Sequence, residues 1–421
     1  MLHINKIREN KDSYITLLKL KNMDATDLFN AVIAKDDERK ATQQKADELL
    51  SKGNQLAKQI GELYKTGKAA EANVLKEESS AIKESSKGLQ TRQGELEKEI
   101  QDILVQIPNI PHPTVPAGKS DADNVTLKEV GTIPTLMEGA KPHWELTTDY
   151  SLIDFELGNK ITGAGFPVYT HNGAKLQRAL ISYFLDKNTA AGYTEYLPPH
   201  LVNEASGFGT GQLPDKEGQM YHATEDNLYL IPTAEVPVTN FFRDVIVKEF
   251  PIKCTAYTPC FRREAGSYGK EVRGLNRLHQ FDKVEIVQVQ HPKKSYETLD
   301  VMVKHVASIL DELELPYKIL QLCGGDLSFT SALTFDFEVY SAGQERWLEV
   351  SSVSNFESYQ ANRLKLRYKD ENGKTQLCHT LNGSALALPR IYAALIENNQ
   401  TAEGIKIPKA LQPYTGFDII K

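Results

Sequence analysis

The chain lacks the excess of basic residues that many nucleic-acid-binding proteins carry. Its 421 residues include 49 Lys and Arg against 56 Asp and Glu, which gives a formal net charge of -7. An RNA partner would therefore have to be bound by a local cluster of positive charge. Long apolar runs are also missing. No segment approaches the roughly 20 apolar residues of a membrane span, so we expect no membrane partner.

Cysteine is scarce as well. The chain has four cysteines, none of them in a C-x-x-C pair: Cys254, Cys260, Cys323 and Cys378. This wide spacing argues against a zinc site and against a disulfide scaffold. It favours a reduced, cytoplasmic setting instead.

Four of the 19 prolines cluster in one short stretch, residues 107–116. Proline removes backbone donors and disfavours helix in the residue before it, so this stretch predicts an extended linker. Residues 1–106 are rich in Lys, Glu, Gln and Ala and have few aromatic residues, whereas most aromatic residues and glycines and both tryptophans lie in residues 117–421. We therefore predict two domains, one on either side of the linker.

The upstream domain carries an apolar seam. Spacings of three and four alternate in a first series, and a second series recurs every seven residues. The first is Ala46, Leu49, Gly53, Leu56, Ile60 and Leu63, and the second is Leu75, Ile82, Leu89, Leu96 and Ile103. A mean period of about 3.5 residues is typical of a coiled coil. The short, glycine-containing break at residues 64–68 predicts an antiparallel hairpin with helices over residues 27–63 and 69–104.

Such a hairpin on its own is most often a dimerisation or scaffold element. Its mixed charges are also typical of a solvated coiled-coil face. Near the break, a modest basic cluster is formed by Lys58, Lys65, Lys68 and Lys76. We take this cluster as a candidate binding surface.

The most informative stretch of the downstream domain is residues 261–285. Two alternating segments there are separated by a glycine-rich, charged loop, which predicts two antiparallel strands. Arg262 and Glu264 would share one face, as would Phe281 and Glu285. A guanidinium, an aromatic ring and a carboxylate on one face can hold a nucleotide. An Arg-x-Glu pair alone is more often a solvated ion pair.

This pattern is one of three motifs that resemble those of class II aminoacyl-tRNA synthetases. Residues 261–285 resemble motif 2. Residues 192–201 resemble motif 1, a helix leading into a strand that ends at a proline, here Pro199. Residues 381–390 resemble motif 3, a strand running into a helix that begins near the glycine. Thr-Ala-Glu at 233–235 and Glu-Val-Ser-Ser at 349–352 are similar to the seryl-tRNA synthetase family itself. The resemblance covers nearly the whole chain.

The resemblance implies ATP as substrate, with Mg²⁺ and no zinc. Its expected catalytic residues are Arg262, at the α-phosphate, and Arg390, at the outer phosphates. Glu349 and Ser352 are the expected Mg²⁺ ligands, and Phe281 is expected to stack on adenine. The set expected to bind ATP is Arg262, Arg263, Glu264, Leu278, Phe281, Glu349, Val350, Ser351, Ser352 and Arg390. The set expected to surround serine is Thr233, Ala234, Glu235, Arg262, Glu285, Asn382 and Ser384.

The implied activity is that of a seryl-tRNA synthetase. Serine is activated by ATP to seryl-adenylate and pyrophosphate, and is then transferred to the 3'-terminal ribose of tRNA(Ser); charging of tRNA(Sec) stays open. The implied fold class is α+β, with an antiparallel coiled-coil hairpin followed by an antiparallel β-sheet domain with flanking helices. The implied partners are a tRNA, bound by the hairpin, and a second copy of the chain, because motif 1 builds a dimer interface in this family.

Two other interpretations stay open. A relative that loads a carrier protein would, by the same resemblance, lack the long hairpin. A non-catalytic binding module would not need Arg262, Glu349 and Arg390. Among the remaining candidates, His279 is expected to be a structural hydrogen-bonding residue, and His143 has no partner pattern in the sequence.

Overall fold

The computed structural model of the chain describes residues 1–264 and 273–421. These residues form two compact units. One unit comprises Leu2–Lys19 and Met23–Pro108, and the other comprises Met1, Leu20–Asn22 and Asn109–Lys421. Among the helices of the described ranges, none has both the length and the apolar character needed to cross a membrane.

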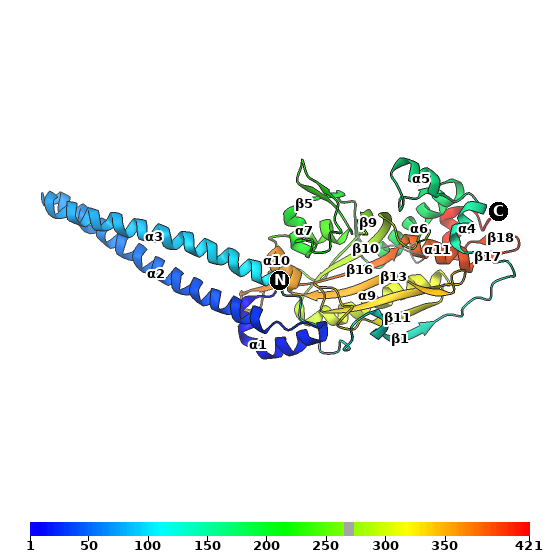
Figure 1. Ribbon diagram of the computed structural model, residues 1–421, viewed down its shortest axis with the longest axis horizontal. Helices are drawn as coiled ribbons and strands as arrows, with labels where there is room; N and C mark the ends of the chain where they lie inside the picture. Colours follow the sequence, from blue (N-terminus) through cyan, green and yellow to red (C-terminus); the bar gives the residue numbers. More distant parts are fainter. Residues whose placement is uncertain (265–272) are drawn as a thin grey trace. The chain divides into compact units, whose positions relative to one another are not determined.

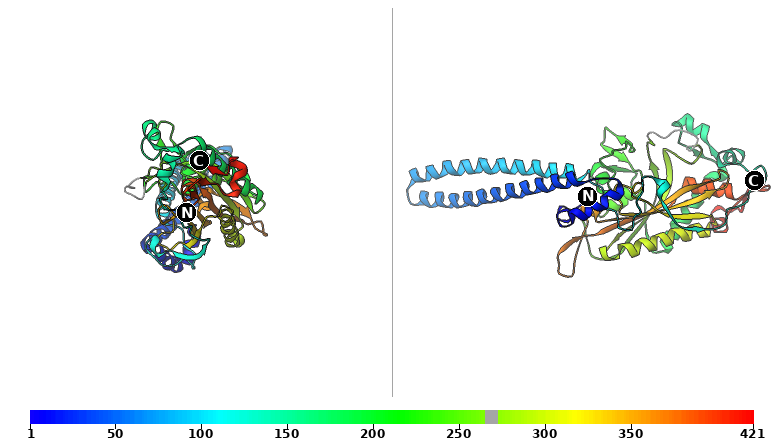
Figure 2. Two further views of the ribbon diagram at one scale, coloured as in Figure 1. Left: turned by 90° about the vertical axis from the view of Figure 1, so that its right-hand side faces the viewer. Right: turned by 60° about the horizontal axis from the view of Figure 1, so that its bottom comes forward.

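The N-terminal unit is a helical hairpin preceded by a shorter helix, α1 (Ile4–Leu18). The hairpin helices α2 (Thr26–Lys65) and α3 (Ala69–Leu104) lie side by side in Figures 1 and 2. The turn between them contains Gly67, whose φ of 77° is left-handed backbone that favours glycine. The predicted hairpin is confirmed, with helix boundaries close to the predicted ones.

The seam between α2 and α3 follows the predicted spacing. Ala46, Leu56, Ile82 and Leu96 are buried. A Cβ added to Gly53 would lie 3.6 Å from the Ile82 side chain, so the two helices meet at this point. Ion pairs flank the seam at Lys35–Glu99, Arg92–Glu38 and Lys52–Glu78. Exposed pairs of this kind contribute only about 0–1 kcal/mol each, so the apolar seam dominates the stability of the hairpin.

The second unit is built on an eight-stranded sheet in the order β1-β11-β12-β13-β16-β10-β9-β4. Neighbouring strands are antiparallel, except that the edge strand β4 runs parallel to β9. The strands are β1 (Val125–Val130), β4 (Thr194–Tyr196), β9 (Ile252–Phe261), β10 (Gln280–Gln290), β11 (Tyr317–Gln321), β12 (Leu333–Ser341), β13 (Arg346–Glu357) and β16 (His379–Ala387). The predicted α+β class is confirmed.

Long helices pack against this sheet: α6 (His171–Ala190), α9 (Ser295–Glu312) and α11 (Leu388–Asn398). Figure 1 shows α9 running along the strands. Leu180, Val306 and Leu395 from the three helices join Val284 and Ile286 of β10 in one apolar core. Because side chains alternate along a strand, Lys283 and Glu285 lie on the opposite face of β10 from Val284 and Ile286.

Shorter elements complete the second unit. The helices are α4 (His143–Asp149), α5 (Phe155–Ile161), α7 (Glu204–Thr210), α8 (Glu235–Asn240), α10 (Tyr359–Leu364) and α12 (Gln412–Thr415). Strands of smaller sheets are β2 (Ile153–Asp154), β3 (Val168–Tyr169), β5 (Leu201–Asn203), β6 (His222–Ala223), β7 (Leu228–Leu230), β8 (Ile246–Val247), β14 (Arg367–Lys369), β15 (Thr375–Leu377), β17 (Gln400–Thr401), β18 (Gly404–Lys406) and β19 (Ile419–Ile420).

The strand of motif 2 is shorter than predicted. β9 ends at Phe261, so Arg262 and Glu264 follow the strand instead of forming its last residues. The backbone N–H of Arg262 still donates to the carbonyl of His279 at 2.9 Å, which extends the pairing by one residue. Glu264 then turns the chain with a φ of 49°.

The helix of motif 3 begins later than predicted. Pairing of β16 continues through Gly383 as far as Ala387, and α11 begins at Leu388. Pro389 lies in the first turn of α11, where a missing N–H is tolerated because it has no partner inside the helix. The proline, more than the glycine, therefore marks the start of this helix.

Candidate active site

Segments far apart in the sequence line one cavity of about 300 Å³ in the second unit. The walls come from the end of β9, the start of β10, the middle of β13 and the junction of β16 with α11. Predicted site residues in this lining are Arg262, Glu264, Leu278, Phe281, Glu349, Val350, Ser351, Ser352, Ser384 and Arg390. The structure thus brings together most of the residues expected to bind ATP.

The strand β10 alternates between the core and the cavity. Val284 and Ile286 are fully buried in the core, whereas Phe281 and Lys283 line the cavity. Lys283 was assigned no role from the sequence. The same alternation that selected Phe281 and Glu285 places Lys283 between them, so the signal was present and was missed. Its Nζ lies 2.8 Å from the Glu285 carboxylate.

Arg262 is held beside the aromatic ring of Phe281. Its guanidinium carbon lies 5.3 Å from the ring centroid, and its Nε donates to the carbonyl of Pro232 at 3.4 Å. A cation over a ring face is attracted by the ring quadrupole, which helps to orient the guanidinium. Glu264 forms an ion pair with Arg277, a second cavity residue that the sequence argument did not select.

Glu349, Ser352 and Arg390 form another part of the wall. Ser352 Oγ lies 3.5 Å from Glu349 Oε1, and Arg390 Nη1 lies 3.5 Å from Glu349 Oε2. Arg390 also donates to two backbone carbonyls, that of Glu349 at 2.8 Å and that of Asn276 at 3.1 Å. Two guanidinium groups, those of Arg262 and Arg390, therefore share one cavity with the Glu349 carboxylate.

The donor set around Ser352 suits a hard cation. Asp336 is the cross-strand neighbour of Ser352, and its buried Oδ1 has no hydrogen-bond partner among the described residues. Burial, with the nearby charge of Glu349 adding to it, raises the pKa of Asp336 well above its usual range. Oxygen donors in this arrangement fit Mg²⁺, which prefers oxygen and retains several non-protein ligands. The described residues contain no preformed group of three or more His, Cys, Asp or Glu ligands, so phosphate oxygens and water would have to complete the shell.

A buried pair of carboxylates lies next to Lys283. Glu285 Oε2 accepts a hydrogen bond from Thr233 Oγ1 at 3.2 Å, and the backbone N–H of Glu235 donates to the same hydroxyl at 3.2 Å. The Glu235 carboxyl accepts from Gln360 Nε2 at 2.6 Å. Burial raises the pKa of Glu235 to about 7; the Gln360 hydrogen bond opposes this rise and the charge of Glu285 adds to it.

The remaining residues expected to surround serine are also close to this pair. Ser384 is the cross-strand partner of Glu285, and Asn382 is the partner of Val287. Both side chains are largely buried, as is Ala234. The structure therefore places Thr233, Glu235, Glu285 and the β16 residues in one neighbourhood that adjoins the cavity through Lys283 and Ser384.

Some predicted residues do not reach the cavity. Arg263 is exposed, and its backbone N–H donates to the carbonyl of Gln219 at 2.9 Å. The predicted motif continues through Ala265 and Gly266, which lie outside the described residues. The four hairpin lysines are exposed and belong to the N-terminal unit: Lys58, Lys65, Lys68 and Lys76.

Gln360 had no signal in the sequence. Its amide joins Glu235 to Thr380, whose Oγ1 donates to Gln360 Oε1 at 2.8 Å. Tertiary packing alone brings these residues together. His279 has the structural contacts expected of it, since its Nδ1 lies 3.1 Å from the hydroxyl of Tyr221 and 3.2 Å from the carbonyl of Arg262.

Two family models match the chain. The seryl-tRNA synthetase N-terminal domain matches residues 1–111, and the tRNA synthetase class II core domain (G, H, P, S and T) matches residues 219–399. A serine–tRNA ligase from Salinibacter ruber is 47% identical over 421 residues, which cover 99% of this chain and 98% of that protein.

Solved structures agree. The seryl-tRNA synthetase of Pyrococcus horikoshii, solved in complex with ATP, is 32% identical and superposes with a TM-score of 0.92. The match covers 100% of this chain and 99% of that one. A cytoplasmic serine–tRNA ligase from Naegleria fowleri, solved with AMP, is 28% identical, with a TM-score of 0.87 and the same coverage.

Proposed function

The chain belongs to the seryl-tRNA synthetase family of ATP-dependent ligases, and we propose from the geometry of its cavity how it activates serine. The observation that carries the proposal is the meeting of Arg262, Arg390 and Glu349 in one cavity. Attack of the serine carboxylate on the α-phosphorus of ATP builds negative charge on phosphate oxygens. Guanidinium groups fixed in advance stabilise that charge, so positioning suffices and no side-chain nucleophile is needed.

Each predicted ATP residue has a physical task in this proposal. Arg262 binds the α-phosphate and the serine carboxylate, and Arg390 binds the outer phosphates as a planar fork. Phe281 stacks on adenine, while Glu264 and the backbone at Leu278 hold the adenosine. Val350 and Ser351 form part of the cavity wall. Arg263 stays a proposed ATP contact, although its side chain does not line the cavity.

We assign the metal position to Glu349 and Ser352. Their oxygens, beside the unpaired carboxylate oxygen of Asp336, are the donors that a Mg²⁺ ion accepts. A bound Mg²⁺ would supply positive charge to the phosphate oxygens. The Arg390 guanidinium lies 3.5 Å from Glu349, so the chain's own cation helps to hold this carboxylate at the cavity.

Serine selection follows from the buried carboxylates. The serine ammonium and hydroxyl both need acceptors, which Glu235 and Glu285 supply; Thr233, Asn382 and Ser384 complete the polar wall. Ala234, between Thr233 and Glu235, packs in the apolar cluster behind this wall. Alanine as a competing substrate lacks the hydroxyl and would leave a buried acceptor unpaired, which can lower its kcat/KM relative to serine by orders of magnitude.

A pyrophosphate-exchange assay with each standard amino acid tests the activation step. We expect ATP-dependent exchange with serine, and exchange with alanine or threonine slower by at least about 10²-fold. The absence of serine-dependent exchange would refute the proposal. Transfer of serine to tRNA(Ser) and to tRNA(Sec) is then assayed separately. Transfer to a tRNA would distinguish this chain from a relative that loads a carrier protein.

The hairpin is proposed to bind the tRNA, with residues 1–106 as the tRNA-binding domain, 107–116 as linker and 117–421 as catalytic domain. Phosphate contacts position a nucleic acid through local positive charge, even in an acidic chain. The candidate cluster is exposed and lies around the turn between α2 and α3. We place the protein in the cytoplasm, where its tRNA substrate is found.

Changing the four cluster lysines together to glutamine is expected to lower kcat/KM for tRNA by about 10- to 100-fold, with a weaker dependence on salt. Serine-dependent exchange should stay within twofold, since the cluster lies outside the cavity. A matched set nearer the base of the hairpin serves as control: Lys45, Lys83, Lys87 and Lys98 to glutamine. Equal loss with both sets would contradict a binding site at the turn.

A homodimer is proposed through motif 1. The strand β4 is an edge of the sheet, and the apolar side chains beside it are exposed: Leu197 is 82% and Leu201 45% accessible. Tyr196 and Phe241, also exposed, pack together with ring centroids 5.1 Å apart. An exposed apolar patch at a sheet edge is typical of a surface that another subunit covers.

Leu197→Glu is expected to convert the dimer into monomers, because it places a charge in the centre of that patch. Sedimentation velocity of the full chain at micromolar concentration measures the change. Ile161→Glu on α5, where the isoleucine is 67% accessible, is the control and should stay dimeric. A wild-type chain that sediments as a monomer would rule out the dimer.

A further inference from the structure

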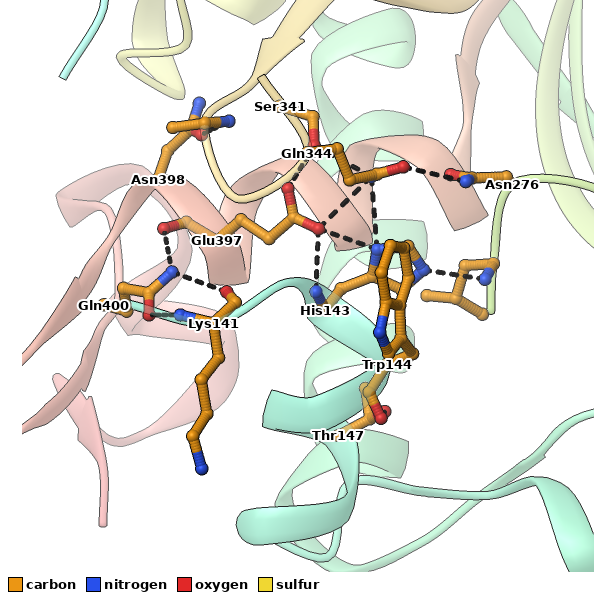
Figure 3. Close-up of polar contacts among 12 residues, drawn as sticks. Lys141, His143, Trp144, Thr147, Asn276, Ser341, Gln344, Glu397, Asn398 and Gln400 are labelled. Atoms are coloured by element: carbon orange, nitrogen blue, oxygen red, sulfur yellow. Dashed lines mark hydrogen bonds and ion pairs between the residues drawn. The ribbon is translucent and has the colours of Figure 1, made fainter. Parts of the chain in front are cut away.

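A buried network connects α11 to the backbone beside the ATP cavity (Figure 3). His143, which has no partner pattern in the sequence, lies at its centre. Its side chain is fully buried, and its Nδ1 lies 2.7 Å from Oε1 of Glu397, which is itself fully buried. The backbone N–H of His143 donates to the same oxygen at 2.7 Å, and Ser341 Oγ donates to Glu397 Oε2. The partners of His143 come from distant parts of the chain, where no sequence pattern pointed to them.

The hydrogen bonds fix one tautomer of His143. The backbone N–H of Leu275 donates to Nε2 at 2.9 Å, so Nε2 must be the unprotonated, accepting nitrogen. The proton then resides on Nδ1 and is donated to Glu397. A neutral imidazole in this tautomer links the Glu397 carboxylate to the backbone of Leu275.

The chain before Leu275 lies directly against the imidazole. A Cβ added to Gly274 would stand 2.2 Å from His143 Nε2, and the φ of Gly274 is 66°. Glycine is therefore required both by the close approach and by the backbone conformation. Trp144 packs against His143 with ring centroids 5.0 Å apart, and the Arg273 guanidinium lies 4.8 Å from the Trp144 ring.

Gln344 adds a second connection to the same segment. Its Nε2 donates to Ser341 Oγ at 2.8 Å and to Glu397 Oε1 at 3.2 Å. Its Oε1 accepts from Asn276 Nδ2 at 2.8 Å. We call His143, Glu397, Ser341 and Gln344 the buried brace. It holds Leu275 by the backbone and Asn276 by the side chain.

The helix α11 contacts this segment at two points. Arg390 and Glu397 are seven residues apart, so both lie on one face of the helix, roughly 10 Å apart along its axis. Glu397 reaches Leu275 through His143, and Arg390 donates directly to the carbonyl of Asn276 at 3.1 Å. Leu275, Asn276 and Arg390 all line the cavity. Displacing the segment would therefore displace the partner that orients Arg390.

We propose that His143 is a positioning residue for ATP: the buried brace holds Leu275 and Asn276 in place, and through Asn276 it orients the Arg390 fork toward the triphosphate. The brace touches neither substrate nor reacting atoms. The inference rests on the proposed function only in taking ATP as the ligand of the cavity. A role in fold stability alone would predict no selective effect on ATP.

Two substitutions of His143 separate the two hydrogen bonds. His143→Asn retains a donor at the position of Nδ1 but leaves the Leu275 N–H without an acceptor, whereas His143→Gln can place an oxygen at the position of Nε2. We expect His143→Asn to weaken ATP binding about tenfold, equivalent to about 1.4 kcal/mol. His143→Gln should stay within about threefold of wild type. Calorimetric titration of the full chain with ATP, without amino acid, measures this.

Hydrogen exchange supplies a readout that does not depend on activity. The Leu275 amide should exchange at least about tenfold faster in His143→Asn than in wild type, because its acceptor is gone. The control is His379→Asn. His379 is a largely buried histidine on β16 bonded to Ser295 Oγ at 2.8 Å, and it does not line the cavity. Its variant should leave ATP affinity and Leu275 exchange within twofold of wild type.

The proposal is overturned if a folded His143→Asn chain binds ATP as wild type does, or if His379→Asn weakens ATP equally. If His143→Asn does not fold, Gln344→Met replaces it. This variant removes the link to Asn276 together with the Gln344 hydrogen bonds to Ser341 and Glu397, but leaves His143 and its bond to Leu275 in place. It should weaken ATP binding by about threefold or more, and unchanged affinity would again overturn the proposal. A wild-type chain that binds ATP but shows no serine-dependent exchange would refute the proposed substrate, while the brace is still decided by ATP binding.

Discussion

Replacing Arg262 by lysine is expected to lower kcat/KM for serine-dependent pyrophosphate exchange by about 10²–10³-fold, the usual cost of losing one preorganised group that stabilises transition-state charge. The charge itself is retained, but lysine is a point charge and cannot form the two parallel hydrogen bonds of a guanidinium. It would also lose the contact with Phe281, whose ring centroid lies 5.3 Å from the Arg262 guanidinium carbon. Exchange kinetics at saturating serine and varied ATP measure the loss.

The same substitution at an arginine outside the cavity tests whether the loss of activity is specific to Arg262. Arg367 on β14 pairs with Asp244 at 2.6 Å and does not line the cavity. Arg367→Lys should therefore keep kcat/KM within twofold of wild type. If Arg262→Lys retained activity within threefold, the bidentate role of Arg262 would be wrong, and the negative charge would have to be stabilised by Arg390 and the metal.

The sequence predicted those features that repeat or alternate. The hairpin followed from an apolar seam, and the buried positions Ala46, Leu56, Ile82 and Leu96 fall on it. The convergence of the motifs in one cavity followed from the alternation along β10 and from the resemblance. Lys283 obeys the same alternation, but the resemblance assigns it no role, so only the structure shows that it lines the cavity.

Contacts between single residues far apart in the chain had no such signal. His143 and Glu397 are separated by 254 positions, and Gln360 and Glu235 by 125. Each pair is built by tertiary packing, and nothing in the sequence links its two members. A buried polar group must find a partner, but no period in the sequence says which partner it finds. The buried brace could therefore be recognised only from the structure.

Glu235→Gln is expected to remove serine activation while making the fold more stable at alkaline pH. The buried Glu235 carboxyl has a pKa raised from 4.5 to about 7. The folded chain thus binds this proton more tightly than the unfolded chain. The stability contributed by the protonated group is complete below about pH 4.5 and is lost as the pH rises to about 7. This linkage corresponds to at most about 3 kcal/mol.

Urea unfolding at pH 5 and pH 8 measures the linkage. Glutamine keeps an acceptor for Gln360 but cannot ionise, so its advantage over wild type should grow between the two pH values. An exposed carboxylate, that of Glu403, gives the control Glu403→Gln, which should leave the pH dependence unchanged. A variant whose stability follows the wild-type curve at both pH values would show that Glu235 is not the titrating group.

Protonation of Glu235 also governs serine binding, but here the pH dependence has the opposite sign: a rise in pH weakens the fold and strengthens serine binding. We propose that the ionised Glu235 carboxylate binds the serine ammonium group, so the wild-type KM for serine should fall as the pH rises toward 7 and level off above it. Groups facing Glu235 shift this midpoint: Glu285 raises it, whereas Lys283 and Arg262 lower it. Glu235→Gln should lower kcat/KM for serine by about 10²-fold or more and abolish the pH dependence between pH 5.5 and 8. A serine KM that is flat across this range in the wild type would contradict a role of the ionised Glu235 carboxylate in serine binding.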